Sequence, residues 1–211
     1  MSGSSTSAWV FPRLSKSARP RGGSRWRCPL PVQGHAVVLD AVRRLVSAGI
    51  DLECHLIGEG PLRESIEADV DRMGLRAIVQ FTGKSPHPEL MKRYEDGEYA
   101  VVVLSSVTLA DGTREGIPIS LVEAMARGIP TIGSSCGGIP ELLADGAGTL
   151  VPEGDANALA DAIEQFLADP QSRHAVGAAG RERIVADFEV RTQTQRLLEA
   201  AQIQVDHRGA A

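Results

Sequence analysis

Apolar runs and amphipathic stretches alternate along the chain from residue 34 onward. The run over residues 99–104 is continuous and rich in β-branched residues, which is typical of a strand buried on both faces of a sheet. Further strands are predicted over 52–57 and 78–81, and helical apolar spacing occupies residues 37–46, 61–73 and 88–94. Gly49 and Gly74 end the first two helical stretches. The alternation predicts an α/β fold, a Rossmann-like parallel sheet with right-handed crossovers and helices on both faces.

The second half of the chain continues the alternation with shorter elements. Pro118 suits the first position of a helix, and Gly128 followed by Pro130 ends that helix near Arg127. Asp155 is a natural N-cap for a later helix with one apolar face. The remaining predicted elements are strands over 131–132 and 150–151 and helices over 139–144, 171–186 and 189–205.

Candidate chemistry gathers where the strand over 99–104 ends. In an open α/β sheet, ligands bind outside the carboxyl ends of the strands, so residues 105–116 form the expected ligand loop. Glu115 lies in this loop and Glu123 on the following helix, a spacing that lets both carboxylates edge one crevice. Free N–H groups at the helix start favour phosphate, and carboxylates accept hydrogen bonds from sugar hydroxyls. Phosphate and sugar together predict a nucleotide-sugar as the ligand.

Each part of this site has a simpler alternative. Glu123 and Arg127 are four residues apart on one helix, so an ordinary ion pair accounts for Glu123 by itself. Glu115 by itself is a loop charge, and Gly137-Gly138 by itself is a tight turn before a helix. These residues therefore indicate a binding site only when they are taken together, in their order along the chain.

The ordered set resembles the donor-binding half of the family 4 glycosyltransferases, which are retaining enzymes of the GT-B fold. Glu115 and Glu123 match the family's E-x7-E pair, and the likeness covers roughly residues 35–198. Other matching segments are residues 57–63, 123–126, 128–130, 137–141, 145–146, 150–155 and 179–183. The loop over 106–118 further resembles the branch that builds bacterial exopolysaccharides such as colanic acid.

The resemblance implies a hexosyltransferase that uses a nucleoside-diphosphate sugar and a saccharide or lipid-linked acceptor, with no cofactor and no metal. It implies that Glu115, holding hydroxyls of the transferred sugar, and Glu123, holding the ribose hydroxyls, are the catalytic residues. Backbone amides would meet the sugar and the diphosphate, and two loops would flank the nucleotide base. The amides belong to Gly116, Ile117, Leu121 and Val122, and the loops contain Gly58, Glu59, Gly60, Gly83 and Lys84.

Two parts of the family pattern have no counterpart in this sequence. A full member has an amino-terminal acceptor domain, and its first donor-domain strand is followed by a glycine-arginine pair and a lysine that grip the diphosphate. Residues 25–33 instead contain Arg27, out of register, and no lysine. We therefore expect a single donor-binding domain without the acceptor domain, from a truncated or frameshifted reading frame. A nucleotide-sugar-binding subunit completed by a separate acceptor subunit, an inactive fragment, and an epimerase of the same fold are the alternatives.

Composition divides the chain into three parts. The formal net charge of −5 conceals six basic and no acidic residues among the first 35, which leaves −11 for the remainder. We predict a disordered or non-homologous segment over 1–33, the nucleotide-sugar-binding domain over 34–205 and a tail over 206–211. The acidic body argues against nucleic-acid partners.

Cysteine, histidine and hydropathy exclude further classes. The three cysteines and five scattered histidines fit neither a disulfide framework nor a zinc site. No apolar stretch approaches the roughly 20 residues of a membrane-spanning helix, and the first residues lack the apolar centre of a secretory signal. We expect a cytoplasmic protein with at most peripheral contact at the inner face of the plasma membrane.

Overall fold

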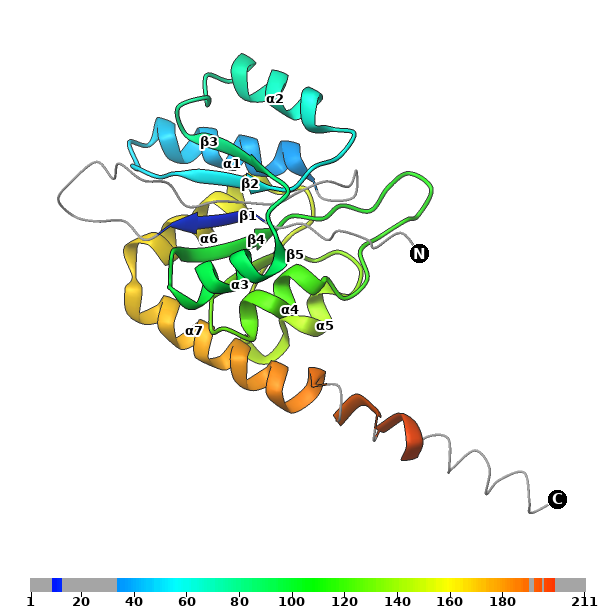
Figure 1. Ribbon diagram of the computed structural model, residues 1–211. Coiled ribbons are helices and arrows are strands. Elements are labelled where there is room, and N and C mark those ends of the chain that lie inside the picture. The colour runs from blue at the N-terminus through cyan, green and yellow to red at the C-terminus, as the bar shows by residue number, and fades with distance from the viewer. Residues whose placement is uncertain (1–8, 13–33, 190–191, 195, 200–211) are drawn as a thin grey trace.

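A six-stranded sheet lies at the centre of the computed structural model, which describes residues 9–12, 34–189, 192–194 and 196–199 (Figure 1). The strands follow the order β3-β2-β1-β4-β5-β6, in which the chain winds outward in both directions from the middle. They are β1 (Trp9–Pro12), β2 (Cys54–Ile57), β3 (Val79–Gly83), β4 (Tyr99–Leu104), β5 (Thr131–Ser134) and β6 (Thr149–Val151).

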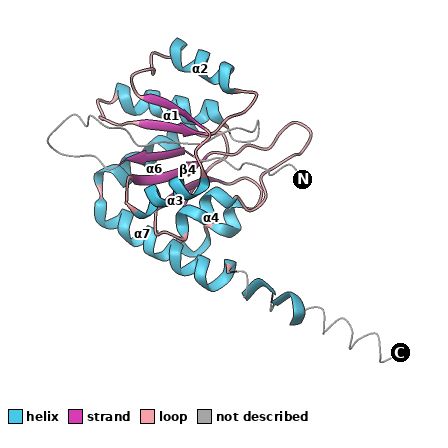
Figure 2. Ribbon diagram, viewed as in Figure 1, coloured by secondary structure: helices cyan, strands magenta, loops and turns pink. Residues whose placement is uncertain are grey.

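Helices cover both faces of this sheet (Figure 2). On one face α1 and α6 pack against each other, and on the other face α4 contacts β4, β5 and α7. The helices are α1 (His35–Ser47), α2 (Arg63–Arg72), α3 (His87–Glu95), α4 (Ile119–Met125), α5 (Ile139–Leu142), α6 (Ala156–Ala168) and α7 (Pro170–Arg183). A 3-10 turn (Ala144–Gly146) precedes β6, and a π turn (Ile184–Phe188) follows α7. The predicted Rossmann-like α/β fold is confirmed.

Burial explains why the central strands form. Every residue of β2, β4 and β5 is buried, as expected for strands covered by helices on both faces. β4 pairs in parallel with β5, and β2 pairs in parallel with β3. The carboxyl ends of these strands therefore meet at one edge of the sheet, where the predicted site loops begin.

The structure differs from two expectations at strand β1. Residues 1–33 were expected to lie outside the folded domain, yet Trp9–Pro12 pair with both β2 and β4 in the middle of the sheet. Both pairings are antiparallel, so the sheet is parallel except at β1. The physical reason is that β2 and β4 are fully buried, and buried backbone N–H and C=O groups need hydrogen-bond partners. The rest of the predicted segment, residues 1–8 and 13–33, lies outside the described residues.

Element boundaries differ from prediction by a few residues. The helix predicted from Pro118 to Arg127 begins at Ile119, with Pro118 as its N-cap in an extended conformation, and ends at Met125. Asp155 is confirmed as an N-cap, because its side chain accepts from the backbone N–H groups of Asn157 and Ala158 at 2.9 Å each. The predicted helix over 189–205 falls in part outside the described residues, as does the predicted tail over 206–211.

Candidate functional site

The site is built at the carboxyl end of β4, where the chain passes the start of α1. Ser105 follows β4, and its Oγ donates a hydrogen bond to the carbonyl of Gly34 at 3.1 Å. Gly34 has a φ of 55°, and a Cβ at this position would lie 2.1 Å from the Ser105 carbonyl oxygen. The first turn of α1 is therefore held directly against the end of β4. His35 opens this helix and is buried, which lowers its pKa from 6.5 to about 4 and leaves the ring neutral near pH 7.

Glu115 lies half-buried in the loop after β4. Its Oε2 accepts a hydrogen bond from Ser106 Oγ at 3.4 Å. Burial raises the pKa of the Glu115 carboxyl above its ordinary value, and hydrogen bonds from Ser106 and from the Gly116 backbone offset part of that rise. The carboxylate is thus kept in a partly desolvated position, held by neutral donors.

The glycine pair after β5 packs against the backbone of Glu115. The Gly138 N–H donates to the Glu115 carbonyl at 3.2 Å. Gly137 has a φ of 58°, and a Cβ there would lie 1.8 Å from the same carbonyl oxygen. The glycine pair therefore does more than form a tight turn. A side chain at Gly137 would push this turn away from the loop that carries Glu115.

Glu123 faces a histidine from a neighbouring helix. Its Oε1 lies 2.8 Å from Nε2 of His87, the first residue of α3, and its side chain is 25% exposed. The simpler alternative, an ion pair between Glu123 and Arg127, is wrong. Arg127 Nε instead faces Glu95 Oε1 at 3.4 Å, and Arg127 Nη1 donates to the main-chain carbonyl of Glu123 at 3.3 Å.

The two predicted base-flanking loops are brought together. Gly58 and Gly83 form an isolated β-bridge at the ends of β2 and β3, with the Gly58 N–H donating to the Gly83 carbonyl at 3.0 Å. Gly83 has a φ of 66°, and a Cβ on it would lie 3.5 Å from Glu59 Oε1. Lys84 follows this bridge and precedes α3, whose first residue reaches Glu123. Residues 84–87 therefore connect the glycine loops to the contact with Glu123 on α4.

Backbone N–H groups at the start of α4 already donate hydrogen bonds within the chain. The N–H groups of Leu121 and Val122 both donate to the Pro118 carbonyl, at 3.1 and 3.2 Å. A diphosphate at this position would compete with these bonds for the same two donors. Gly116 and Ile117 precede the helix and are exposed.

Sequence reasoning missed His87 and Ser106 as members of this site. Each follows the carboxyl end of a strand, β3 for His87 and β4 for Ser106, which is the signal that could have identified them. Among the described residues, no group of three or more His, Cys, Asp and Glu side chains is placed to hold a metal ion. No helix in the described part of the chain is long and apolar enough to cross a membrane.

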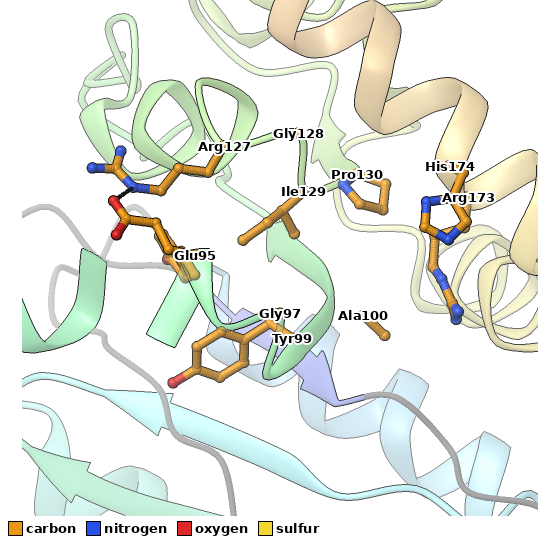
Figure 3. A pocket seen from close by; sticks show the side chains of 11 residues that line it. Glu95, Gly97, Tyr99, Ala100, Arg127, Gly128, Ile129, Pro130, Arg173 and His174 are labelled. Carbon is orange, nitrogen blue, oxygen red and sulfur yellow. Dashed lines mark ion pairs between the residues drawn. The ribbon is translucent and has the colours of Figure 1, made fainter. Parts of the chain in front are cut away.

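A separate pocket lies at the opposite end of the sheet, where β4 and β5 begin (Figure 3). Its volume is about 240 Å³. Arg127 and Glu95 stand on one side of it, and Arg173 and His174 of α7 stand on the other (Figure 3). The guanidinium groups are engaged, because Arg127 faces Glu95 and Arg173 Nη1 donates to the Phe166 carbonyl at 3.1 Å. None of the predicted site residues lines this pocket.

Comparison with known proteins places this architecture in a family. The family model described as "Glycosyl transferases group 1" matches residues 30–183. The chain is 37% identical to WcaL of Escherichia coli, a glycosyltransferase named for colanic acid biosynthesis, and 37% identical to the amylovoran biosynthesis glycosyltransferase AmsK of Erwinia amylovora. Each match covers 74% of this chain and 38% of the relative, so the chain spans about two fifths of the length of these proteins.

A solved structure agrees with the fold. The sucrose-phosphate synthase of Thermosynechococcus elongatus superposes with a TM-score of 0.65 at 30% identity, over 85% of this chain and 43% of that one. The family model covers most of the described domain, including the loop with Glu115, the helix with Glu123 and the glycine pair. The chain belongs to the glycosyl transferases group 1 family.

Proposed function

We propose that this chain is the donor-binding domain of a retaining hexosyltransferase of exopolysaccharide synthesis, and that it binds a nucleoside-diphosphate sugar at the carboxyl end of the sheet. One observation carries the proposal. In the part of the chain that the structure describes, neither Glu115 nor Glu123 forms an ion pair with a lysine or arginine. A partly buried carboxylate without a cationic partner loses hydration, and sugar hydroxyls compensate that loss by donating hydrogen bonds.

The two carboxylates bind different parts of the ligand. Glu123, held by His87 near the glycine loops, accepts from the ribose hydroxyls, and Glu115 accepts from hydroxyls of the sugar to be transferred. Backbone N–H groups of Gly116 and Ile117 donate toward the diphosphate. Such oriented amides stabilise the negative charge that develops on the leaving phosphate.

The bonds and the proton of the transfer balance between the two substrates. The bond between the anomeric carbon and the phosphate oxygen breaks, and its electron pair leaves with the nucleoside diphosphate. The acceptor hydroxyl oxygen forms the new bond on the same face of the sugar, and its proton passes to the leaving phosphate. The acceptor is a saccharide or a lipid-linked saccharide, in keeping with relatives named for colanic acid and amylovoran biosynthesis.

A nucleotide-sugar-binding subunit is the second candidate. Both carboxylates of the proposed site are assigned to the donor, so donor binding by itself accounts for their arrangement. In this case a separate subunit supplies the acceptor site, and the purified chain binds the donor without transferring sugar.

Isothermal titration with UDP, GDP, UDP-glucose and GDP-mannose tests the proposal. We expect one nucleotide to bind with a Kd between about 1 μM and 1 mM, and Glu123→Ala to weaken that binding about tenfold or more. Glu115→Ala should weaken the sugar nucleotide more than the free diphosphate. Glu164→Ala, on an exposed position of α6, is the control. Wild-type affinity in Glu123→Ala, or a folded chain that binds none of the four ligands, would contradict the proposal.

A further inference from the structure

His87 is the one side chain that the structure shows hydrogen-bonded to the Glu123 carboxylate among the described residues. It begins α3 directly after Pro86, which caps the helix in an extended conformation. The side chain is 65% exposed, yet its Nε2 lies 2.8 Å from Glu123 Oε1 on a different helix. An ionised carboxylate only accepts hydrogen bonds, so Nε2 carries the proton in this contact. Oε2 of Glu123 is left to accept from a ligand.

The helix that carries His87 is fixed at its other end too. Glu95, the last residue of α3, faces Arg127 just beyond α4, with 3.4 Å between Oε1 and Nε (Figure 3). Tyr94, the residue before Glu95, packs edge to face on Tyr99, with ring centroids 5.4 Å apart. The two ends of α3 thus contact the second half of α4 and a residue just beyond it, and this holds the start of α3 near Glu123.

The contact adds little to folding. An exposed pair of this kind contributes little to stability, because solvent screens it and both side chains lose rotamer freedom. The main effect of the contact is on the orientation of the Glu123 carboxylate. Without a partner, the Glu123 side chain is free to change rotamer, and ordering it again opposes ligand binding.

We propose that His87 is a positioning residue that orients the Glu123 carboxylate toward the vicinal hydroxyls of ribose, and so makes the site selective for ribonucleotides over 2′-deoxyribonucleotides. The inference rests on the proposed donor site and deepens it. Each carboxylate oxygen has two lone pairs, so Oε1 can accept from His87 and from one hydroxyl while Oε2 accepts from the other. Loss of the 2′-hydroxyl leaves one oriented acceptor without a donor, which is what produces the discrimination.

The test compares the Kd of UDP with that of 2′-deoxy-UDP, and of GDP with 2′-deoxy-GDP, in five proteins: wild type, His87→Ala, His87→Gln, Glu123→Ala and His174→Ala. We expect His87→Ala to weaken the ribonucleotide about three- to tenfold and to reduce the ratio between the two affinities. His87→Gln keeps an N–H donor and should recover most of both. His174→Ala removes an exposed histidine at the opposite end of the sheet and should change neither. Thermal unfolding checks that each variant folds.

The outcomes separate this inference from the proposed function. If Glu123→Ala weakens ribonucleotide binding while His87→Ala binds like the wild type, the role of His87 is wrong and the donor site stands. If His87→Ala weakens the ribo and deoxy forms equally, His87 does not determine selectivity. If the folded wild-type chain binds neither UDP nor GDP, the donor site and the role of His87 both fail.

Discussion

Each end of α3 is held by a contact between a carboxylate and a nitrogen-bearing side chain, and the two contacts differ in what they leave available to a ligand. At the carboxyl end of the sheet, the Glu123 carboxylate meets an imidazole and keeps one oxygen available. At the opposite end, Arg127 is shared between the Glu95 carboxylate and the Glu123 main-chain carbonyl. In the proposed site the first contact leaves a carboxylate oxygen that accepts from sugar hydroxyls, whereas the second contact places two opposite charges against each other. We therefore assign ligand binding to the Glu123 contact and a structural role to the Arg127 contact, an assignment that the following experiments test.

The largest expected effect comes from separating the loops at the carboxyl end. Gly137→Ala places a Cβ 1.8 Å from the Glu115 carbonyl oxygen, so the loops must move. Gly112→Ala is the matched control, because Gly112 also has a positive φ, of 84°, with nothing within 4 Å of an added Cβ. We expect Gly137→Ala to lower the free energy of unfolding by about 2 kcal/mol more than Gly112→Ala, measured by urea denaturation. Equal losses would mean that the close approach is unimportant.

A smaller effect is expected at the other end. Arg127→Ala removes the contact with Glu95, whose carboxylate is 62% exposed and stays hydrated without its partner. Urea denaturation should therefore show a loss of about 1 kcal/mol or less, and titration should show a nucleotide Kd within about twofold of wild type. A loss of nucleotide affinity as large as that of Glu123→Ala would remove the distinction between the two ends.

The smallest effect is a pH dependence at Glu115. Burial raises the pKa of this carboxyl in the folded chain, so ionising it costs more in the folded than in the unfolded state. Its favourable contribution is present below the unfolded pKa, near pH 4, and is lost as pH rises through the folded pKa. Glu115→Gln should thus have a higher melting temperature than wild type at pH 7, with the difference shrinking toward pH 4. A difference that is constant with pH, or of opposite sign at pH 7, would contradict this account.

Much of the fold follows from local patterns in the sequence. Alternating apolar runs and helical stretches predict the order of strands and helices from β2 to α7, and Asp155 caps α6 as expected. Boundaries shift because strand ends depend on their neighbours. β3, for example, extends to Gly83 because Ile57 pairs with it. Strand β1 was missed because it lies within a segment rich in Ser, Arg, Pro and Gly and its partners, β2 and β4, are distant in sequence.

The site residues stay a prediction, and their contacts differ from those that spacing along one element suggests. Spacing along one helix suggests an ion pair between Glu123 and Arg127, but both side chains instead contact residues of α3. The Glu123 carboxylate lies against His87, 36 residues away, and the Arg127 guanidinium lies against Glu95. Likewise, Gly137 reads as a turn residue, and only the fold brings the Glu115 backbone against it. Periodicity and spacing report neighbours along one element, whereas these contacts arise between elements.

Amide chemical-shift mapping tests the central claim most directly. The ¹⁵N-labelled chain is titrated with UDP and with GDP, and shifts at the carboxyl end of the sheet are compared with shifts at the pocket of Figure 3. We predict that the nucleotide that binds perturbs residues 83–87 and 115–123 most and leaves residues 128–130 and 173–174 nearly unchanged. Largest shifts at residues 128–130 and 173–174 would place the ligand at the opposite end and contradict the account.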